Sequence, residues 1–176
     1  QKKSSKTAFS IIELSIVAII IAALVGGIIS AKQIVLNARL TTARTLTKSS
    51  PVNDIDNLVV WYEATMPQSF DDLSADDSKT VSTWYNLSPE TNNATQATDT
   101  NKPRYVASGI NGLPVLNFDG VDNFLSFDGT ALANSNYTVF VVDQRRSARA
   151  DNYFIGGDTI GTNKMLILGY VTNNTV

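Results

Sequence analysis

One apolar run near the start of the chain constrains its fold more than any other feature. Residues 9–29 read F-S-I-I-E-L-S-I-V-A-I-I-I-A-A-L-V-G-G-I-I and contain a single charge, Glu13. As an α-helix this run would be roughly 31 Å long, which matches the hydrocarbon thickness of a bilayer. Its apolar residues cover every face of the helix, whereas a helix of a soluble core is apolar on one side. The run therefore predicts a transmembrane helix.

The charges around this run predict its orientation. Lys2, Lys3 and Lys6 precede it, so its first end should stay in the cytoplasm. Glu13 lies inside the run, and a carboxylate near the centre of a bilayer costs about 3 kcal/mol on insertion scales. Such a residue normally has a partner or a function.

The order of these features resembles the N-terminus of type IV pilins and of the related pseudopilins of type II secretion. In those precursors a basic leader ends in a small residue, an aromatic residue follows, and a glutamate stands four residues further on. Here these parts are residues 1–8, Ala8, Phe9 and Glu13. Ala8 departs from the family, in which glycine is usual.

The resemblance implies a maturation pathway at the bacterial inner membrane. A prepilin peptidase would cleave between Ala8 and Phe9 on the cytoplasmic face, and the new Phe9 amine would be methylated. Glu13 would then pair with the terminal amine of an adjacent subunit, which offsets the cost of burying its charge.

Two simpler interpretations compete with this one. The run could belong to an ordinary signal peptide, with Ile29-Ser30-Ala31 as its cleavage site, or to a plain single-pass anchor. Glu13 lies early in the run, where neither would favour it, and the run is long for the core of a signal peptide.

The helix is expected to continue into water as the second half of a spine that covers residues 9–50. Its apolar face is predicted to pack under a head, and Ser49, Ser50 and Pro51 end it. Gly26 and Gly27 are the expected place for any local unwinding. The residues at helical spacing on that face are Ala31, Ile34, Val35, Ala38, Thr42 and Thr45, with Lys32, Arg39 and Lys48 elsewhere.

Beyond a linker at 51–57 the pattern changes to short β-branched and aromatic runs between turn residues. This pattern is typical of a β-sandwich or jelly roll, so the fold class is α+β with an all-β head over 58–176. Because the chain stops just after a strand-like run, we expect the roll to be incomplete at its C-terminus. The predicted strands are 58–62, 80–85, 104–107, 113–118, 124–127, 137–143, 153–155 and 164–170.

The head resembles the laminin-G-like, concanavalin-A-like jelly rolls of bacterial surface proteins. The matching blocks occur in the family's order, and Glu63 and Asn86 stand where aspartate is common. The blocks are W-Y-E-A at 61–64, V-S-T-W-Y-N-L at 81–87, N-N-A-T-Q at 92–96, P-R-Y at 103–105 and N-G-L-P-V-L-N-F-D-G at 111–120. The resemblance implies a head that binds glycans or surface proteins through rim loops, in some relatives with Ca²⁺.

Composition argues against enzymes and nucleic-acid binders. The chain has no cysteine and no histidine, which excludes thiolate chemistry, a serine triad and imidazole metal sites. Residues 1–50 carry a net charge of +6 and residues 51–176 one of −8, which together give −2. An acidic head is a poor partner for phosphate groups.

Two sets of residues in the head are candidates for binding. Asp119, Asp122 and Asn123 supply hard oxygens for Ca²⁺, although a turn capped by aspartates is the simpler explanation of them. Three tyrosines would be suited to stacking on a sugar if they are exposed, although a place in the core or rim is the simpler expectation. They are Tyr85, Tyr105 and Tyr153.

The sequence thus predicts a non-enzymatic, pilin-like protein with a displayed adhesive head. Its expected partners are the membrane, prepilin peptidase, other pilin-like subunits, and a glycan or surface protein. The alternatives are a secretion pseudopilin and a membrane-anchored, lectin-like protein that never polymerises.

Overall fold

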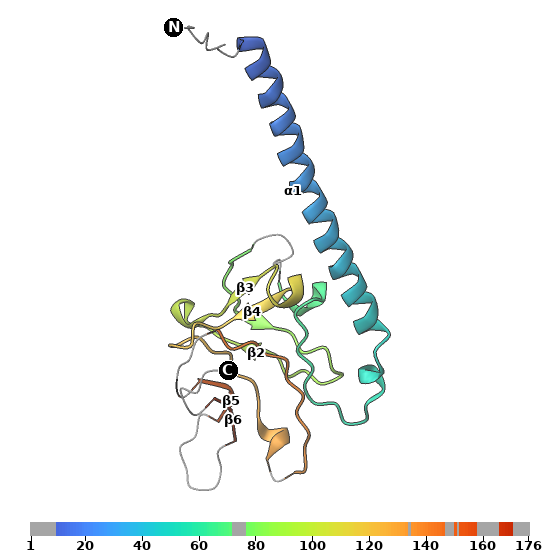
Figure 1. The fold of residues 1–176 in the computed structure, drawn as a ribbon. Coiled ribbons are helices and arrows are strands. Elements are labelled where there is room, and N and C mark those ends of the chain that lie inside the picture. Colours follow the sequence, from blue (N-terminus) through green and yellow to red (C-terminus); the bar gives the residue numbers. More distant parts are fainter. Residues whose placement is uncertain are drawn as a thin grey trace, which may run out of the picture.

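The computed structural model describes residues 10–71, 77–133, 135–146, 150, 152–157 and 166–170. It has one long helix, α1 (Ile11–Lys48), and a small head built from short 3-10 turns and short antiparallel strands. The first half of α1 extends away from the head, and its second half lies against it (Figure 1). The α+β class with a long N-terminal helix is therefore confirmed.

Helix α1 begins and ends close to where the sequence predicts. Ser10 caps its start and Ser49 its end, and the following turn, Pro51–Asp54, forms a 3-10 helix inside the predicted linker. The helix is continuous through Gly26 and Gly27, so the expected unwinding is not found. About 1 kcal/mol for each glycine is less than the loss of the backbone hydrogen bonds of a broken turn.

The head packs on a different side of α1 from the one predicted. The half-buried positions along the second half of the helix are Leu36, Leu40, Ala43, Arg44 and Thr47. The predicted face is exposed instead, with Ile34 at 68% and Val35 at 50%.

Two arginines and a glycine turn fix this contact. Arg44 Nε donates to the carbonyl oxygen of Thr65 at 2.7 Å, and Arg39 Nη1 donates to that of Asn111 at 3.2 Å. Gly112 lies so close to Leu36 that a Cβ added to it would meet Leu36 Cδ2 at 3.1 Å. Arg39, placed away from the head by the sequence prediction, is one of the residues that hold it.

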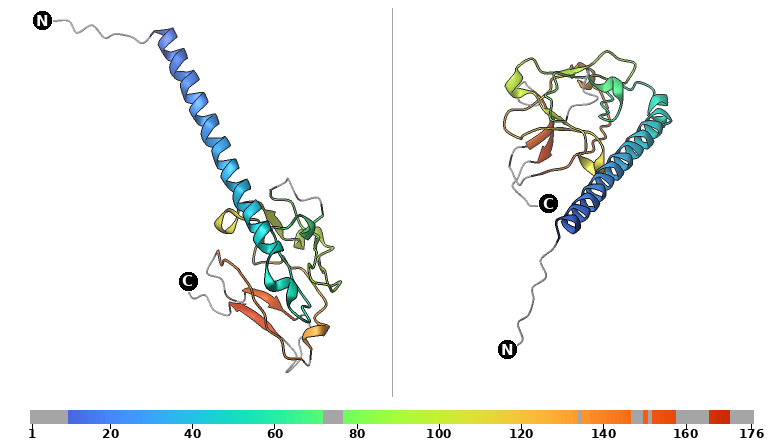
Figure 2. Two further views of the ribbon diagram at one scale, coloured as in Figure 1. Left: turned by 90° about the vertical axis from the view of Figure 1, so that its right-hand side faces the viewer. Right: turned by 90° about the horizontal axis from the view of Figure 1, so that it is seen from above.

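The strands form three separate two-stranded antiparallel sheets. These are β1 (Thr83–Trp84) with β2 (Ala94–Thr95), β3 (Arg104–Val106) with β4 (Val115–Asn117), and β5 (Asn152–Gly156) with β6 (Ile167–Tyr170). Figure 2 shows β5 and β6 on the side of the head away from the α1 contact. Among the described residues these sheets do not join into the two packed sheets of a jelly roll.

Three of the predicted strands do not form as such. Residues 58–62 form no strand, and in residues 124–127 only Ser126 makes a bridge, an isolated one to Thr95. Residues 137–143, all of them described, have no strand partner, and Phe140 in this run is 91% exposed. Extended backbone becomes a strand only where a second segment offers hydrogen bonds in register.

The core of the head is a small aromatic cluster. Phe70, Val81 and Tyr105 are buried, and Trp84 packs against them. The Phe70 ring lies 5.8 Å from the Trp84 ring and 5.6 Å from the Tyr105 ring, measured between centroids. Rings at these separations add to the stabilisation from their burial.

Candidate functional site

The N-terminus of α1 holds Glu13 in a capping box with Ser10. The backbone N–H of Ser10 donates to Glu13 Oε2 at 2.8 Å, and Ser10 Oγ accepts from the N–H of Ile12 at 3.2 Å. A carboxylate in the first turn also interacts favourably with the helix dipole. Glu13 thus has a partner within its own chain. The sequence analysis did not predict this capping box, although Ser10 and Glu13 have its Ser-x-x-Glu spacing.

The two residues expected at the cleavage point, Ala8 and Phe9, lie outside the described residues. The part of the chain that the structure describes begins at Ser10, so the processing prediction stays a prediction.

The first half of α1 is apolar and has no packing partner within the described chain. Every residue from 10 to 35 is exposed, and the apolar side chains include Ile19 at 69% and Ile28 at 69%. By length and composition this helix is able to cross a membrane, a test that a signal sequence near an N-terminus also passes. Such a surface needs lipid or other helices around it, because water-exposed apolar area on this scale is strongly unfavourable.

Asp119, Asp122 and Asn123 come together in one turn. Asp119 Oδ1 accepts from the N–H groups of Val121 at 2.8 Å and of Asp122 and Asn123 at 3.3 Å each. Gly120 supplies the positive φ of +72° that this turn requires. These donors lower the pKa of Asp119, with the Val121 N–H as the main cause.

Asn123 adds further hydrogen bonds to the turn. Asn123 Oδ1 accepts from the N–H of Asp119 at 3.2 Å, and Asn123 Nδ2 lies 3.5 Å from Asp122 Oδ1. One oxygen of each of the three side chains is therefore held by a group of the turn itself. Within the described ranges no group of three or more Asp, Glu, His or Cys side chains lies together, and Ca²⁺ binding here stays a prediction.

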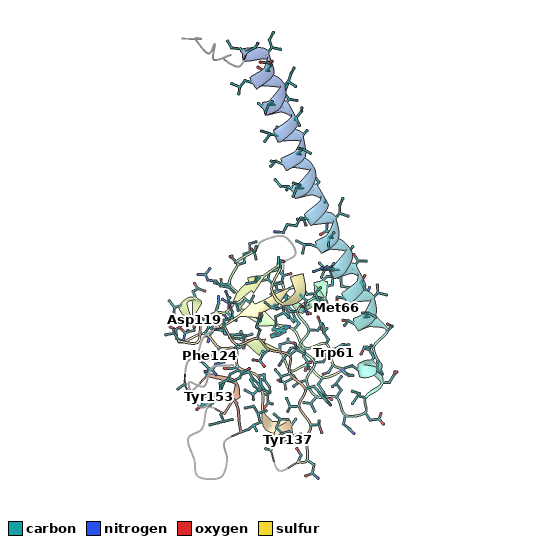
Figure 3. All side chains as sticks on the ribbon, in the orientation of Figure 1. Trp61, Met66, Asp119, Phe124, Tyr137 and Tyr153 are labelled. Carbon is teal, nitrogen blue, oxygen red and sulfur yellow. The ribbon has the colours of Figure 1, made fainter. Side chains whose placement is uncertain are left out.

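The three candidate tyrosines have different places. Tyr105 is 9% exposed and belongs to the core, which is the simpler of the two places expected for it and leaves its ring unable to stack on a sugar. Tyr85 donates its hydroxyl to Asp71 Oδ1 at 2.7 Å, and this hydrogen bond raises its pKa. Tyr153 on β5 is 42% exposed and lies, with Asp119 and Phe124, on the side of the head away from α1 (Figure 3).

The two departures from the laminin-G-like pattern have local structural roles. Asn86 Oδ1 accepts from the N–H of Trp61 at 2.7 Å, and Asn86 Nδ2 donates to the carbonyl oxygens of Val59 and Glu90 at 2.9 Å each. Glu63 Oε1 accepts from the N–H of Thr65 at 2.8 Å. Both side chains therefore hold the entry segment of the head in place.

Comparisons with protein-family models, with curated proteins and with solved structures find no match. The function is therefore inferred from the long helix, from its capping box and from the contacts between the helix and the head.

Proposed function

We propose that this chain is a pilin-like subunit whose apolar helix first anchors it in the bacterial inner membrane and later packs inside a filament. In this proposal a prepilin peptidase removes residues 1–8, and Glu13 pairs with the amine of Phe9 in a neighbouring subunit. The head is displayed outside the membrane as part of a jelly-roll-type adhesive domain.

One observation carries the proposal. Helix α1 is continuous from Ile11 to Lys48, yet its first 25 residues are all exposed while its last third holds the head. A single-pass anchor needs only about 20 apolar residues and places no demand on the residues after it. A filament core requires a long helix that exposes apolar residues at one end and packs against a head at the other, and α1 matches this requirement.

The head supports a binding role more than a catalytic one. Glu63, one of the two glutamates in the head, is engaged in a turn, and exposed aromatic residues such as Phe124 and Tyr153 lie on the side away from α1. Exposed aromatic rings are suited to stacking on sugars or to protein contact. A glycan array, with and without a calcium chelator, tests this part of the proposal.

The decisive experiment measures the mature N-terminus. The full chain is expressed in a host with a prepilin peptidase, and the purified protein is analysed by mass spectrometry. The expected product starts at N-methylated Phe9, whereas an Ala8→Leu variant stays unprocessed because its residue before the cut is no longer small. Retention of residues 1–8 in the wild type, or cleavage after Ala31, contradicts the proposal and favours the anchor or the signal peptide.

The two alternatives separate at assembly. A pseudopilin would be processed in the same way but would co-purify with a secretion system rather than with surface filaments. An anchored, lectin-like protein would bind its glycan while leaving α1 in the membrane, and it would not sediment with filaments.

A further inference from the structure

The hairpin between β3 and β4 carries the one Asn-Gly pair of the sequence, Asn111-Gly112. A glycine after an asparagine favours attack on the side-chain amide, because glycine has no Cβ to shield its backbone nitrogen or to restrict its rotation. The Asn111 side chain is exposed, and among the described residues its amide has no hydrogen-bond partner. The amides of Asn86, Asn92 and Asn123, in contrast, are held by hydrogen bonds.

The reaction open to such a pair is deamidation. The backbone nitrogen of Gly112 attacks Cγ of Asn111 and loses its proton, the side-chain nitrogen leaves as ammonia, and a five-membered imide ring forms. Water then opens the ring. Addition at the side-chain carbonyl gives aspartate, and addition at the main-chain carbonyl gives isoaspartate, in which the backbone runs through Cβ and Cγ. Nothing is oxidised or reduced, and water is the only co-reactant.

The backbone of Asn111 does not have the conformation that this attack needs. Its φ is 55° and its ψ is 23°. The ring closes only when the Gly112 nitrogen eclipses Cβ, and because the substituents of Cα are about 120° apart in projection, this requires a ψ of about −120°. A rotation of roughly 140° about the Cα–C bond of Asn111 must therefore precede the reaction.

Helix α1 opposes this rotation at two points, where the hairpin tip lies beside it (Figure 1). The carbonyl oxygen of Asn111, which turns with the Cα–C bond, accepts from Arg39 Nη1 at 3.2 Å. Gly112 stands so close to the helix that an added Cβ would meet Leu36 Cδ2 at 3.1 Å. Because the β3–β4 ladder fixes both ends of the hairpin, the rotation has to move the tip away from α1.

We propose that Asn111 is a site of spontaneous deamidation and that docking of the hairpin tip on α1 protects it. Isoaspartate at position 111 then records that the head has left the helix. The inference concerns the contact between head and helix within one chain, so it does not depend on the assembly of a filament.

The modification also hinders a return to the docked state. In isoaspartate the carbonyl that Arg39 binds becomes part of a free carboxylate, and the main chain to Gly112 gains one methylene group. The hydrogen bond from the Leu113 N–H to the carbonyl oxygen of Ile110, 3.0 Å long, and the close approach of Gly112 to the helix both fit the shorter chain. We expect a converted tip to dock less well, so that release is difficult to reverse.

The test compares two substitutions on the same helix. Arg39→Ala removes the donor to the Asn111 carbonyl oxygen, and Lys32→Ala removes an exposed cation elsewhere on α1. The full chain in detergent is incubated in mildly alkaline buffer, which promotes loss of the proton from the attacking nitrogen. Peptide mass spectrometry with electron-transfer fragmentation measures isoaspartate at position 111 over time. Near-ultraviolet circular dichroism of the head is recorded for each variant.

We expect Arg39→Ala to convert Asn111 roughly fivefold or more faster than the wild type, because a hydrogen bond from a charged donor no longer opposes opening of the turn. Lys32→Ala should match the wild type. In concentrated urea all three chains should react at one common, faster rate, since the helix then restrains none of them.

Asn111→Gln tests the consequence of the modification. Glutamine would have to close a six-membered ring, so it reacts far more slowly. Protease sensitivity of the junction between helix and head should rise during incubation of the wild type, in step with isoaspartate, and should stay constant in the glutamine variant.

The outcomes bear on separate parts of the inference. Equal rates in the wild type and Arg39→Ala overturn the protection by α1, and an Asn111 that stays unconverted in urea overturns the site itself. Faster conversion that comes with loss of the near-ultraviolet signal also counts against protection by docking, because the turn then opens by unfolding of the head. A junction that keeps its protease resistance after conversion overturns the effect on docking.

Discussion

At the residue scale, the side chain of Asn86 joins the entry segment of the head, at Val59 and Trp61, to its own loop, at Glu90. Its amide both accepts and donates, whereas the aspartate common in laminin-G-like domains only accepts when ionised. The contacts of Nδ2 with the carbonyl oxygens of Val59 and Glu90 therefore require the amide.

Replacing this amide by a carboxylate should destabilise the head. Asn86→Asp loses the donated hydrogen bonds and places a negative oxygen against two carbonyl oxygens. We expect the free energy of unfolding to fall by about 2–3 kcal/mol. Urea titration of the full chain in detergent, followed by tryptophan fluorescence, measures this change.

A matched control is Asn136→Asp, which makes the same chemical change at an exposed position. If both variants unfold at the same urea concentration, the hydrogen bonds of Asn86 contribute little to stability.

The Asp119 turn makes a prediction that depends on pH. Asp119→Ala removes the acceptor of three backbone N–H groups, and at pH 7 it should cost about 1 kcal/mol or less because the turn is exposed. The pKa of Asp119 is lowered by folding, so the stabilisation from its charge is present above about pH 4 and is lost as the pH falls through the lower, folded-state pKa. Thermal unfolding of wild type and variant should therefore converge in acid.

Calcium distinguishes the turn from a metal site. If Asp119 serves only to hold the turn, the difference between wild type and Asp119→Ala should be the same with Ca²⁺ as with a chelator. A difference that appears only with Ca²⁺ would instead establish the metal site expected from sequence.

At the element scale, the attachment of the head to α1 depends on a close approach. Gly112 has a φ of +76° and stands against both Leu36 and Arg39 of the helix. Gly112→Ala adds backbone strain and brings a methyl group within 3.1 Å of Leu36 Cδ2, so we expect a loss of about 1–2 kcal/mol. Limited proteolysis of the junction between helix and head should become faster.

Gly129→Ala is the matched control for this substitution. Gly129 has a negative φ and no atom within 4 Å of an added Cβ. Equal protease sensitivity in the two variants would show that the helix contact does not restrain the head.

The existence and the ends of α1 were predictable from sequence, and the side that meets the head was not. A uniformly apolar run followed by Ser49, Ser50 and Pro51 defines a helix and its end without tertiary information. The second half has two comparable apolar stripes, one with Leu36 and Leu40 and one with Ile34 and Val35. The choice between them depends on where the head places Asn111 and Thr65, which no local pattern encodes.

The strands were less predictable because they are short and paired by distant segments. Residues 58–62 have strand composition, yet Trp61 and Val59 bond to the side chain of Asn86 instead of to a ladder. The two residues that form β2, Ala94–Thr95, stand in a polar stretch with little strand character and pair because Thr83–Trp84 lies beside them. At the candidate site, the residues of the calcium prediction were found together, and the capping box of Glu13 was overlooked.

At the scale of the whole molecule, the chain is amphiphilic and divided by charge. The first half of α1 is apolar and exposed, and in the sequence residues 1–50 carry a net charge of +6 against −8 on residues 51–176. Glu13 stands at the start of the apolar end, where it caps its own helix and is also the proposed partner of a neighbouring amine.

Glu13→Gln separates these two roles of Glu13. Glutamine also completes a capping box, so the hydrogen bond from the Ser10 N–H and the start of α1 should be kept, and membrane insertion should be unchanged. The charge is lost, so pairing with a positive amine is lost with it, and filament incorporation should fall roughly tenfold or more. Ser10→Ala gives the opposite combination, a weakened cap with the charge retained, and should assemble nearly as well as the wild type. A glutamine variant that assembles normally would mean that the carboxylate serves only to begin the helix.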